Sequence, residues 1–532
     1  MSAVNAATAA VKTVADPCAA YESLAPLWLK SRAACSGERF VKEYDRKVDT
    51  LLFTNLLLPF SVSMQQHQYN FYRAEAEWPG VVAMYSRMLV GSLLRKVPQL
   101  TFREGAGVPE GVKEWIMNEF GKDDSSMTAF MDEALKEEIE TSAAWVIVDH
   151  PEVSEERLAS MEKAERDKLK PYPLIHRAES VINWRESESE SGKQVLDRLL
   201  IRGYRHEYED EDQFHPTYIE TVLVHEINSA GKYWIRVYER KTPVSDVPVV
   251  AGKVVQPMGP QQMELVDIKE PKVNGELLTY IPAWPLNGSI EPREPLLIPL
   301  IDKEVHLYNK LSRRNHLLYG AATYTPVLSS EMNDDQFDDI VDSGLGSWIK
   351  IGKDDKLDVL KTPTEALADM EVAIAAAFEE MAKLGVRMQT AETDQSGVAL
   401  ELRNASQSAQ LGTLNTRVSE TMCQIIIFMI NWRYGLDLKA GDVEFKLSAD
   451  FNPAPLGDAW LRLATEWYQA GIIPRSVWIL LLKHNDMVPP DYDDNKGQEE
   501  INSDELVVTP KVQHEAEMAA LEADNSAPEN KV

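Results

Sequence analysis

The spacing of hydrophobic residues divides the chain into a helical first part, a strand-rich middle and a helical last part. Apolar residues three and four positions apart predict helices between Tyr21 and about Val97, and again over Met127–Glu140. The apolar run Trp145–Asp149 that follows predicts a buried strand. The charged stretch Ser154–Lys170 predicts a surface helix, since two prolines stop it directly afterwards.

The middle of the chain changes to the pattern of strands. Leu199–Tyr208, Tyr218–Ile227 and Tyr233–Arg240 are rich in β-branched and aromatic residues and predict three strands. Asn228–Gly231 predicts a hairpin turn between the last two. Proline and glycine interrupt Lys241–Pro295, which therefore predicts loops with short strands.

A long helix with two apolar stripes is predicted over Leu296–Tyr319, ending at Gly320. The stripes consist of Leu300, Leu307, Leu311 and Leu318, and of Ile301, Val305 and Tyr308. An apolar face this broad is typical of a helix that is covered on two sides. We therefore expect the helix to contact more than one neighbour, and in an oligomer one neighbour can be another subunit.

A small insert, Ala321–Lys361, follows this helix. It contains a strand-like run, Thr323–Leu328, and a second predicted strand, Ser347–Ile351. Between them lies an acidic turn consisting of Asp334, Asp335, Asp338, Asp339 and Asp342. The turn has too few glycines and the wrong spacing for a calcium loop. Because the insert is small and separately punctuated between two helices, we expect it to be exposed, and its acidic turn suits a basic partner.

A second long helix is predicted over Thr364–Met388, about 37 Å of helix. Its apolar residues alternate in steps of three and four: Leu367, Met370, Ile374, Ala377, Met381, Leu384 and Met388. This heptad seam fits either a contact between subunits or an internal helix of a globular domain. The charged residues off the seam are Glu371, Glu379, Glu380, Lys383 and Arg387.

A polar run, Gln389–Gly397, separates this helix from a last long helix over Val398–Tyr434. One face of the last helix consists of Leu411, Leu414, Val418, Ile425, Met429 and Trp432. Two short helices are predicted around Gly471. The acidic end of the chain is poor in apolar residues and predicts disorder, as does the alanine-rich start.

The charge balance limits the classes of function. The 532-residue chain has 85 acidic and 55 basic residues, a formal net charge of −30. This balance argues against a protein that wraps nucleic acid by neutralising phosphates, yet it allows one past which DNA slides. An acidic surface can also simply keep a protein in solution.

Motifs for catalysis, cofactors and membranes are absent from the sequence. No phosphate-binding glycine loop, HExxH motif or nucleophile elbow occurs, and His225 reads as a structural histidine in a strand. The three cysteines, Cys18, Cys35 and Cys423, form no CxxC pair and suit a reducing cytosol. We find neither a signal peptide nor a membrane span, so the sequence predicts a non-enzymatic protein without cofactors or metals, made in the cytoplasm.

The order of the elements resembles the portal proteins of tailed double-stranded DNA phages. The resemblance lies in a helix, a small β insert, a longer helix, a polar loop and a long helix, and it extends over about residues 20–505. Tyr172–Leu174, Ser180–Trp184, Ile281–Leu286 and Leu296–Pro299 also resemble one branch of these proteins. Portal proteins have no catalytic motif, so the resemblance depends on the order of the predicted elements and on their residue composition.

The resemblance implies an α+β, mainly helical, portal-type fold that assembles as a ring. Its regions would be a flexible arm (1–20), the wing (21–295 and 398–449), the outer stem helix (296–319), the clip (320–361), the channel helix (362–388), the tunnel loop (389–397), the crown (450–504) and a disordered acidic tail (505–532). The tunnel-loop residues expected near DNA are Gln389, Glu392, Asp394, Gln395, Ser396 and Gly397.

The resemblance also implies a function and partners. The chain would be one subunit of a ring, usually of twelve, at one vertex of a virion capsid. DNA would pass through the ring without sequence-specific contacts during packaging and ejection. The ring would contact the major capsid protein, and its clip would dock the terminase large subunit and later the head–tail adaptor, with the acidic turn as the contact.

Two alternatives stay open at this point. One is a virion structural or adaptor protein without a channel, and the other is a cytosolic enzyme with dispersed catalytic residues. A ring with a DNA-wide hole would distinguish the portal from the first. A monomer or small oligomer with a closed pocket would favour the second.

Overall fold

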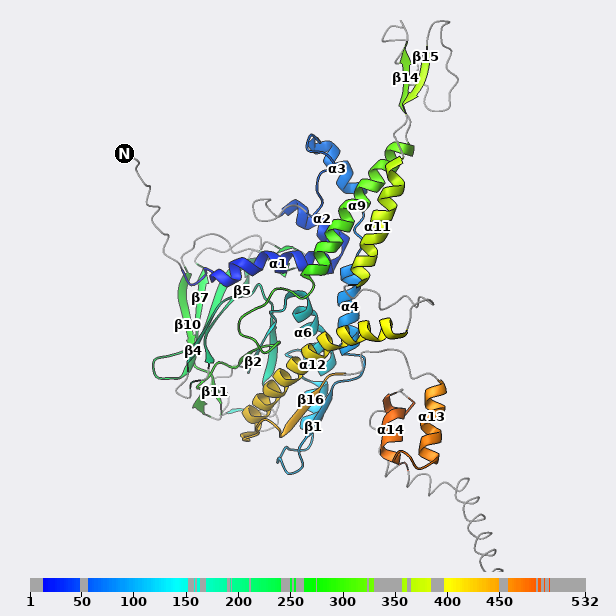
Figure 1. Ribbon diagram of the computed structural model, residues 1–532. Coiled ribbons are helices and arrows are strands. Elements are labelled where there is room, and N and C mark those ends of the chain that lie inside the picture. The colour runs from blue at the N-terminus through cyan, green and yellow to red at the C-terminus, as the bar shows by residue number, and fades with distance from the viewer. Residues whose placement is uncertain are drawn as a thin grey trace, which may run out of the picture. The chain divides into compact units, whose positions relative to one another are not determined.

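The structure of the protein is a computed structural model (Figure 1). It describes residues 13–47, 56–151, 157, 160–162, 169–188, 192, 194–209, 212–240, 249–250, 253–254, 263–273, 275–322, 325–329, 356–360, 365–383, 397–448, 458–484, 487–488, 492 and 497. The chain divides into two compact units, Met1–Ala449 and Asp450–Val532. Helices and strands both contribute substantially, as the sequence predicts.

Helices dominate the first part of the larger unit. They are α1 (Ala19–Ser36), α2 (Glu38–Lys47), α3 (Gln66–Glu75), α4 (Val81–Leu93), α5 (Val112–Asn118) and α6 (Met127–Thr141). Helix α6 lies where the sequence predicts it, because Ser126 caps its N-terminus by accepting from the Ala129 amide at 3.3 Å. At its C-terminus Ser142 adopts a left-handed conformation with φ 54°, which ends the helix.

The largest sheet of this unit in the described residues has five antiparallel strands, in the order β10-β7-β6-β5-β4. Its strands are β4 (Val181–Glu188), β5 (Gln194–Glu209), β6 (Asp212–Ile227), β7 (Tyr233–Arg240) and β10 (Met263–Lys269). The three predicted strands are confirmed within β5, β6 and β7. Tyr21 and Trp28 of α1 pack on the sheet together with Leu200 and Val222.

A second sheet has β2 (Trp145–Asp149) between β13 (Ala283–Pro285) and β3 (Tyr172–His176). The predicted buried strand is confirmed, since residues 145–148 are all buried. Strand β1 (Gln99–Phe102) pairs with the distant β16 (Val443–Lys446). Two small ladders complete the strands of this region: β8 (Val249–Val250) with β9 (Lys253–Val254), and β11 (Lys272–Val273) with β12 (Glu276–Leu277).

The last part of the larger unit contains α9 (Ile298–Ala322), β14 (Thr325–Ser329), β15 (Lys356–Leu360), α11 (Glu365–Lys383) and α12 (Gly397–Tyr434). The smaller unit has α13 (Asp458–Gln469) and α14 (Arg475–His484) on either side of Gly471. The three long helices and the two short helices that the sequence predicts in this part of the chain are confirmed. Strand β15, which pairs with β14, was not predicted.

Several predicted boundaries are wrong. Helix α9 continues through Gly320 to Ala322, because a glycine inside a helix costs only about 1 kcal/mol. Gly397, expected in a loop, is the first residue of α12. The predicted arm also ends too late, since α1 begins at Ala19 and the Cys18 amide donates to the Ile182 carbonyl at 3.0 Å.

Other predictions fall outside the described residues. They concern most of the charged stretch 154–170, the strand 347–351 and the acidic tail 505–532. Within the described part of the chain, every helix is too short or too polar to cross a bilayer. The same residues contain no group of three or more His, Cys, Asp or Glu side chains that could hold a metal ion.

Candidate functional site: a helical arm and its buried anchor

Two helices pack side by side, and two paired antiparallel strands lie beyond one end of the pair (Figure 1). The chain runs along α9, through the paired strands β14 and β15, and back along α11. We call α9 and α11 the helical arm, and β14 with β15 the tip hairpin. The tip hairpin follows the end of α9 and precedes the start of α11, so it lies where these two helix ends meet.

Both apolar stripes of α9 are buried within one chain over the first half of the helix. Leu300 and Leu307 of one stripe are at most 4% exposed, as are Ile301 and Tyr308 of the other. Helices α1, α3, α4 and α11 all contact α9. Over this half of α9 the chain's own helices supply the cover that the two stripes predict, whereas Leu318 near the end of the helix is 38% exposed.

Helix α11 packs on α9, and the heptad seam of α11 is partly buried within the chain. Ile374 and Met381 are buried, and Leu367, Met370 and Ala377 are half-buried. Leu384 and Met388 lie outside the described residues. Within one chain, the described part of the seam packs only in part, and the contact between subunits stays a prediction.

Charged residues predicted on the channel helix partly pair with α9. Lys303 contacts Glu380 at 2.6 Å and Arg314 contacts Glu371 at 3.4 Å, whereas Glu379 is exposed. Such exposed ion pairs add little to the free energy of unfolding. Their main effect is on the register in which α9 and α11 pack. Lys383 lies in the last position of α11, and Arg387 lies outside the described residues.

A buried carboxylate joins the base of the arm to α4. Glu304 of α9 accepts hydrogen bonds from the backbone amides of Val81 at 2.6 Å and Val82 at 3.0 Å. These amides belong to the first turn of α4, where no partner within the helix exists for them. Burial raises the pKa of Glu304 to about 7, although the amides it accepts from lower it. Glu304 therefore acts as a cap supplied by a different helix.

Two further residues of α9, Asp302 and Asn309, fix the arm to the N-terminal part of the chain. Lys30 of α1 contacts Asp302 at 2.6 Å. The side chain of Asn309 accepts from the Leu58 amide and donates to the Leu56 carbonyl, both at 2.8 Å. Asn309 thus provides hydrogen-bond partners for two backbone groups, the Leu56 carbonyl and the Leu58 amide, in a segment that lies outside the helices and strands.

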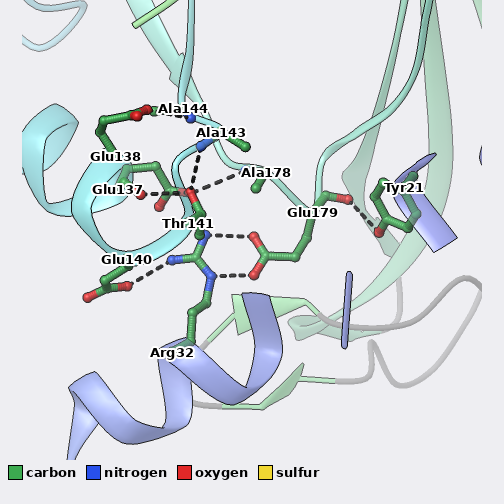
Figure 2. A network of polar contacts seen from close by, with 10 residues as sticks. All are labelled: Tyr21, Arg32, Glu137, Glu138, Glu140, Thr141, Ala143, Ala144, Ala178 and Glu179. Carbon is green, nitrogen blue, oxygen red and sulfur yellow. Dashed lines mark hydrogen bonds and ion pairs between the residues drawn. The ribbon is translucent and has the colours of Figure 1, made fainter. Parts of the chain in front are cut away.

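Below the arm, one arginine holds three carboxylates (Figure 2). Arg32 of α1 is 1% exposed and forms ion pairs with Glu137, Glu140 and Glu179. Its contact with Glu140 is 2.9 Å, and the second oxygen of Glu179 accepts at 2.6 Å. Burial alone would lower the pKa of Arg32, but the Glu179 and Glu137 carboxylates raise it well above its ordinary value. We call these four residues the Arg32 cluster.

The Arg32 cluster connects three parts of the fold. Arg32 belongs to α1, Glu137 and Glu140 to α6, and Glu179 to the turn before β4. The Tyr21 hydroxyl donates to the Glu179 carbonyl at 3.0 Å, as Figure 2 shows. All three guanidinium nitrogens contact carboxylates, so the cluster positions α1 against α6 and the turn before β4.

A fourth carboxylate beside the cluster differs from the other three. Glu138 accepts from the Ala144 amide at 3.1 Å and is 3% exposed. Burial raises the pKa of Glu138 to about 8, and the hydrogen bond from Ala144 opposes this only in part. At neutral pH this carboxyl is therefore largely protonated.

Neither the Arg32 cluster nor the buried Glu304 was predicted from the sequence. Arg32 follows Lys30 at a distance of two residues and looks like a second surface charge of α1, and Glu304 looks like one more charge between two apolar stripes. Only the tertiary fold brings their partners close, since Arg32 and Glu179 are 147 positions apart. His225 was interpreted correctly, because it is buried and contacts the Tyr233 hydroxyl at 2.7 Å.

Most predicted contact residues lie outside the described part of the chain. They are the acidic turn (Asp334, Asp335, Asp338, Asp339 and Asp342) and the loop residues Gln389, Glu392, Asp394, Gln395 and Ser396. Their roles remain predictions. Gly397 is described only as the start of α12.

Comparison with known proteins gives two matches. A family described as "Domain of unknown function (DUF4055)" matches residues 296–433, which contain the helical arm, the tip hairpin and nearly all of α12. The fold is similar to a chain of a solved structure titled "Virion of native gene transfer agent (GTA) particle", with a TM-score of 0.37 and 10% sequence identity. That similarity covers 78% of this chain and 93% of the other. No curated protein matches the chain.

Proposed function

We propose that the protein is a portal subunit, which forms a ring around a DNA channel at one vertex of a virion. The observation that carries this proposal is the helical arm with its tip hairpin, followed by α12. The order of these elements is the one on which the resemblance to portal proteins depends. In this proposal α9 and α11 are the stem, and the segment between them is the clip.

The anchor at the base supports a mechanical role. Lys30, Glu304 and Asn309 fix α9 to segments far away in the sequence, and the Arg32 cluster fixes α1 to α6 and to the sheet. An arm that projects from a body needs such a base if it is to bear force. None of these contacts requires a substrate or a cofactor.

Net charge supports passage of DNA rather than tight binding. Twelve subunits of −30 each would carry 12 × (−30) = −360. Duplex DNA carries about one negative charge per 1.7 Å of its axis, so a basic channel would bind at every phosphate. An acidic channel lets DNA slide, and an external motor such as terminase would supply the work.

The remaining partners follow from the same proposal. The clip would dock the terminase large subunit and then the head–tail adaptor through its acidic turn, and the wing would contact the major capsid protein. The protein would therefore be found at the portal vertex of the virion, after assembly in the host cytoplasm.

Chemical modification of Ser396 tests whether the loop before α12 faces DNA. The Ser396→Cys variant, labelled with a bulky maleimide, should form intact rings but lose most DNA packaging, because the label would obstruct the channel. Packaged DNA protected from nuclease is the readout.

The matched control is Ser229→Cys, which places the same label in the exposed turn between β6 and β7. The unmodified chain, with its own three cysteines, is labelled in parallel. Full packaging after complete labelling at Ser396 would show that this loop does not line the channel.

A further inference from the structure

Two exposed apolar surfaces lie on opposite flanks of the helical arm. Helix α3 contacts α9 on one side, and α11 contacts it on the other (Figure 1). The α3-side surface consists of Leu58, Phe60, Val62 and Phe71, which are 37–108% exposed. The α11-side surface consists of Ala368, Val372, Ala375 and Phe378, of which Val372 is 71% exposed.

The α3-side surface is held in a fixed position. Asn309 binds the backbone on both sides of Leu57, and the Tyr69 hydroxyl donates to the Leu57 carbonyl at 2.8 Å. The Phe60 ring lies 4.6 Å from the ring of His316, between centroids. Phe71 is 72% exposed although its neighbour Tyr72 is buried. Asn309, Tyr69 and His316 therefore hold the backbone and the Phe60 ring of this surface, while its apolar side chains are exposed.

Charge distinguishes the two surfaces. From Leu56 to Ala74 the chain has no acidic residue, and it contains Arg73 and His67. The α11-side surface is bordered by Glu371 and Glu379, both exposed. The chain has a net charge of −30, so a surface without acidic residues is unusual in it. The α3-side surface is therefore suited to a partner surface that is apolar and has acidic residues at its border, as the α11-side surface does.

We propose that the α3-side surface of one copy packs against the α11-side surface of the next copy. Alanines 368 and 375 are seven positions apart and let a neighbouring side chain approach the helix closely. Because the two surfaces differ, the contact is head-to-tail, and repetition of a head-to-tail contact closes into a ring or continues as a helix. This inference rests on the proposed function, since it names the contact that would build the ring.

Pairs of cysteines test this contact. Phe71→Cys or Leu58→Cys is combined in one chain with Val372→Cys or Ala375→Cys, and the purified assembly is treated with a short bis-maleimide. We expect a ladder of covalent oligomers on a denaturing gel for at least one of the four pairs. The unmodified chain measures any background from Cys18, Cys35 and Cys423.

The single-cysteine variants are the decisive controls. A head-to-tail contact brings residue 71 near residue 372 but not near another residue 71, so each single variant should stay monomeric on the gel. A strong dimer from a single variant would contradict the proposal, because it indicates a two-fold contact. Rings that form normally while all four pairs fail to cross-link would also overturn it and leave the portal function standing. If the unmodified chain forms no ring, the proposed function itself fails.

A charge introduced into the contact gives an independent measurement. Phe71→Asp should raise the protein concentration needed for assembly about tenfold or more, because it removes a phenylalanine that the contact would bury and adds an acid opposite Glu371 and Glu379. Phe214→Asp is the matched control, since Phe214 is 88% exposed on β6 and belongs to neither surface. Equal assembly of the two variants would contradict the proposal.

Discussion

Replacing Arg32 with methionine is expected to destabilise the unit Met1–Ala449 by about 3–5 kcal/mol, because the change leaves Glu137, Glu140 and Glu179 buried without their cation. Methionine approximates the length of the arginine stem, so the loss reports charge and hydrogen bonding more than volume. The free energy of unfolding in urea is the measurement. Arg32→Lys should also lose stability, since an ammonium cannot bridge three carboxylates as the guanidinium does.

The matched control for Arg32 lies on the same helix. Lys30→Met removes the contact with Asp302, whose side chain is 51% exposed, and should cost at most about 1 kcal/mol. Changing Glu137 and Glu179 to glutamine in the Arg32→Met background should restore part of the lost stability. A loss of less than 1 kcal/mol for Arg32→Met would contradict the view that this cluster anchors α1.

Stability is expected to fall as the pH rises from about 6.5 to 8.5. Burial raises the pKa of Glu138 to about 8 and that of Glu304 to about 7, both above the ordinary value of 4.5. The folded state therefore keeps protons that the unfolded state has lost, and the free energy of unfolding decreases as those protons leave. For Glu138 alone the decrease over this window is about 2 kcal/mol.

The buried histidines oppose this trend only at the lower end of the window. Burial lowers the pKa of His176 to about 4 and that of His225 to about 3, so these residues destabilise the fold progressively as the pH falls below about 7.5. Glu138→Gln keeps an acceptor for the Ala144 amide and should flatten the pH dependence. Glu133→Gln, an exposed position of the same helix, should leave it unchanged. An unchanged slope in Glu138→Gln would show that Glu138 is ionised throughout.

Local patterns predicted the elements of the fold well. The strand at Trp145–Asp149 and the strand at Tyr233–Arg240 begin and end where the sequence predicts, since each is a short β-rich run bounded by turn residues. Strand β15 was missed because Lys356–Leu360 contains charged residues and has apolar residues at only three of its positions. This strand forms because it pairs with β14, and that pairing cannot be seen in the local sequence of β15.

Tertiary contacts could not be predicted in the same way. The stripes of α9 correctly indicated a helix that is covered on two sides, but periodicity does not reveal whether the cover comes from the same chain or from another. The roles predicted for residues 389–396 and for the acidic residues of 334–342 are further cases, because they depend on the assembly rather than on a local pattern. The Arg32 cluster depends on residues brought together from three distant segments.

Electron microscopy of the purified full-length chain tests the central claim most directly. The account predicts closed rings in end-on views, with a central hole wide enough for duplex DNA, and a particle mass that is an integer multiple of the 60.0 kDa subunit. A uniform population of monomers, or an oligomer without a continuous channel at assembly concentrations, would contradict it.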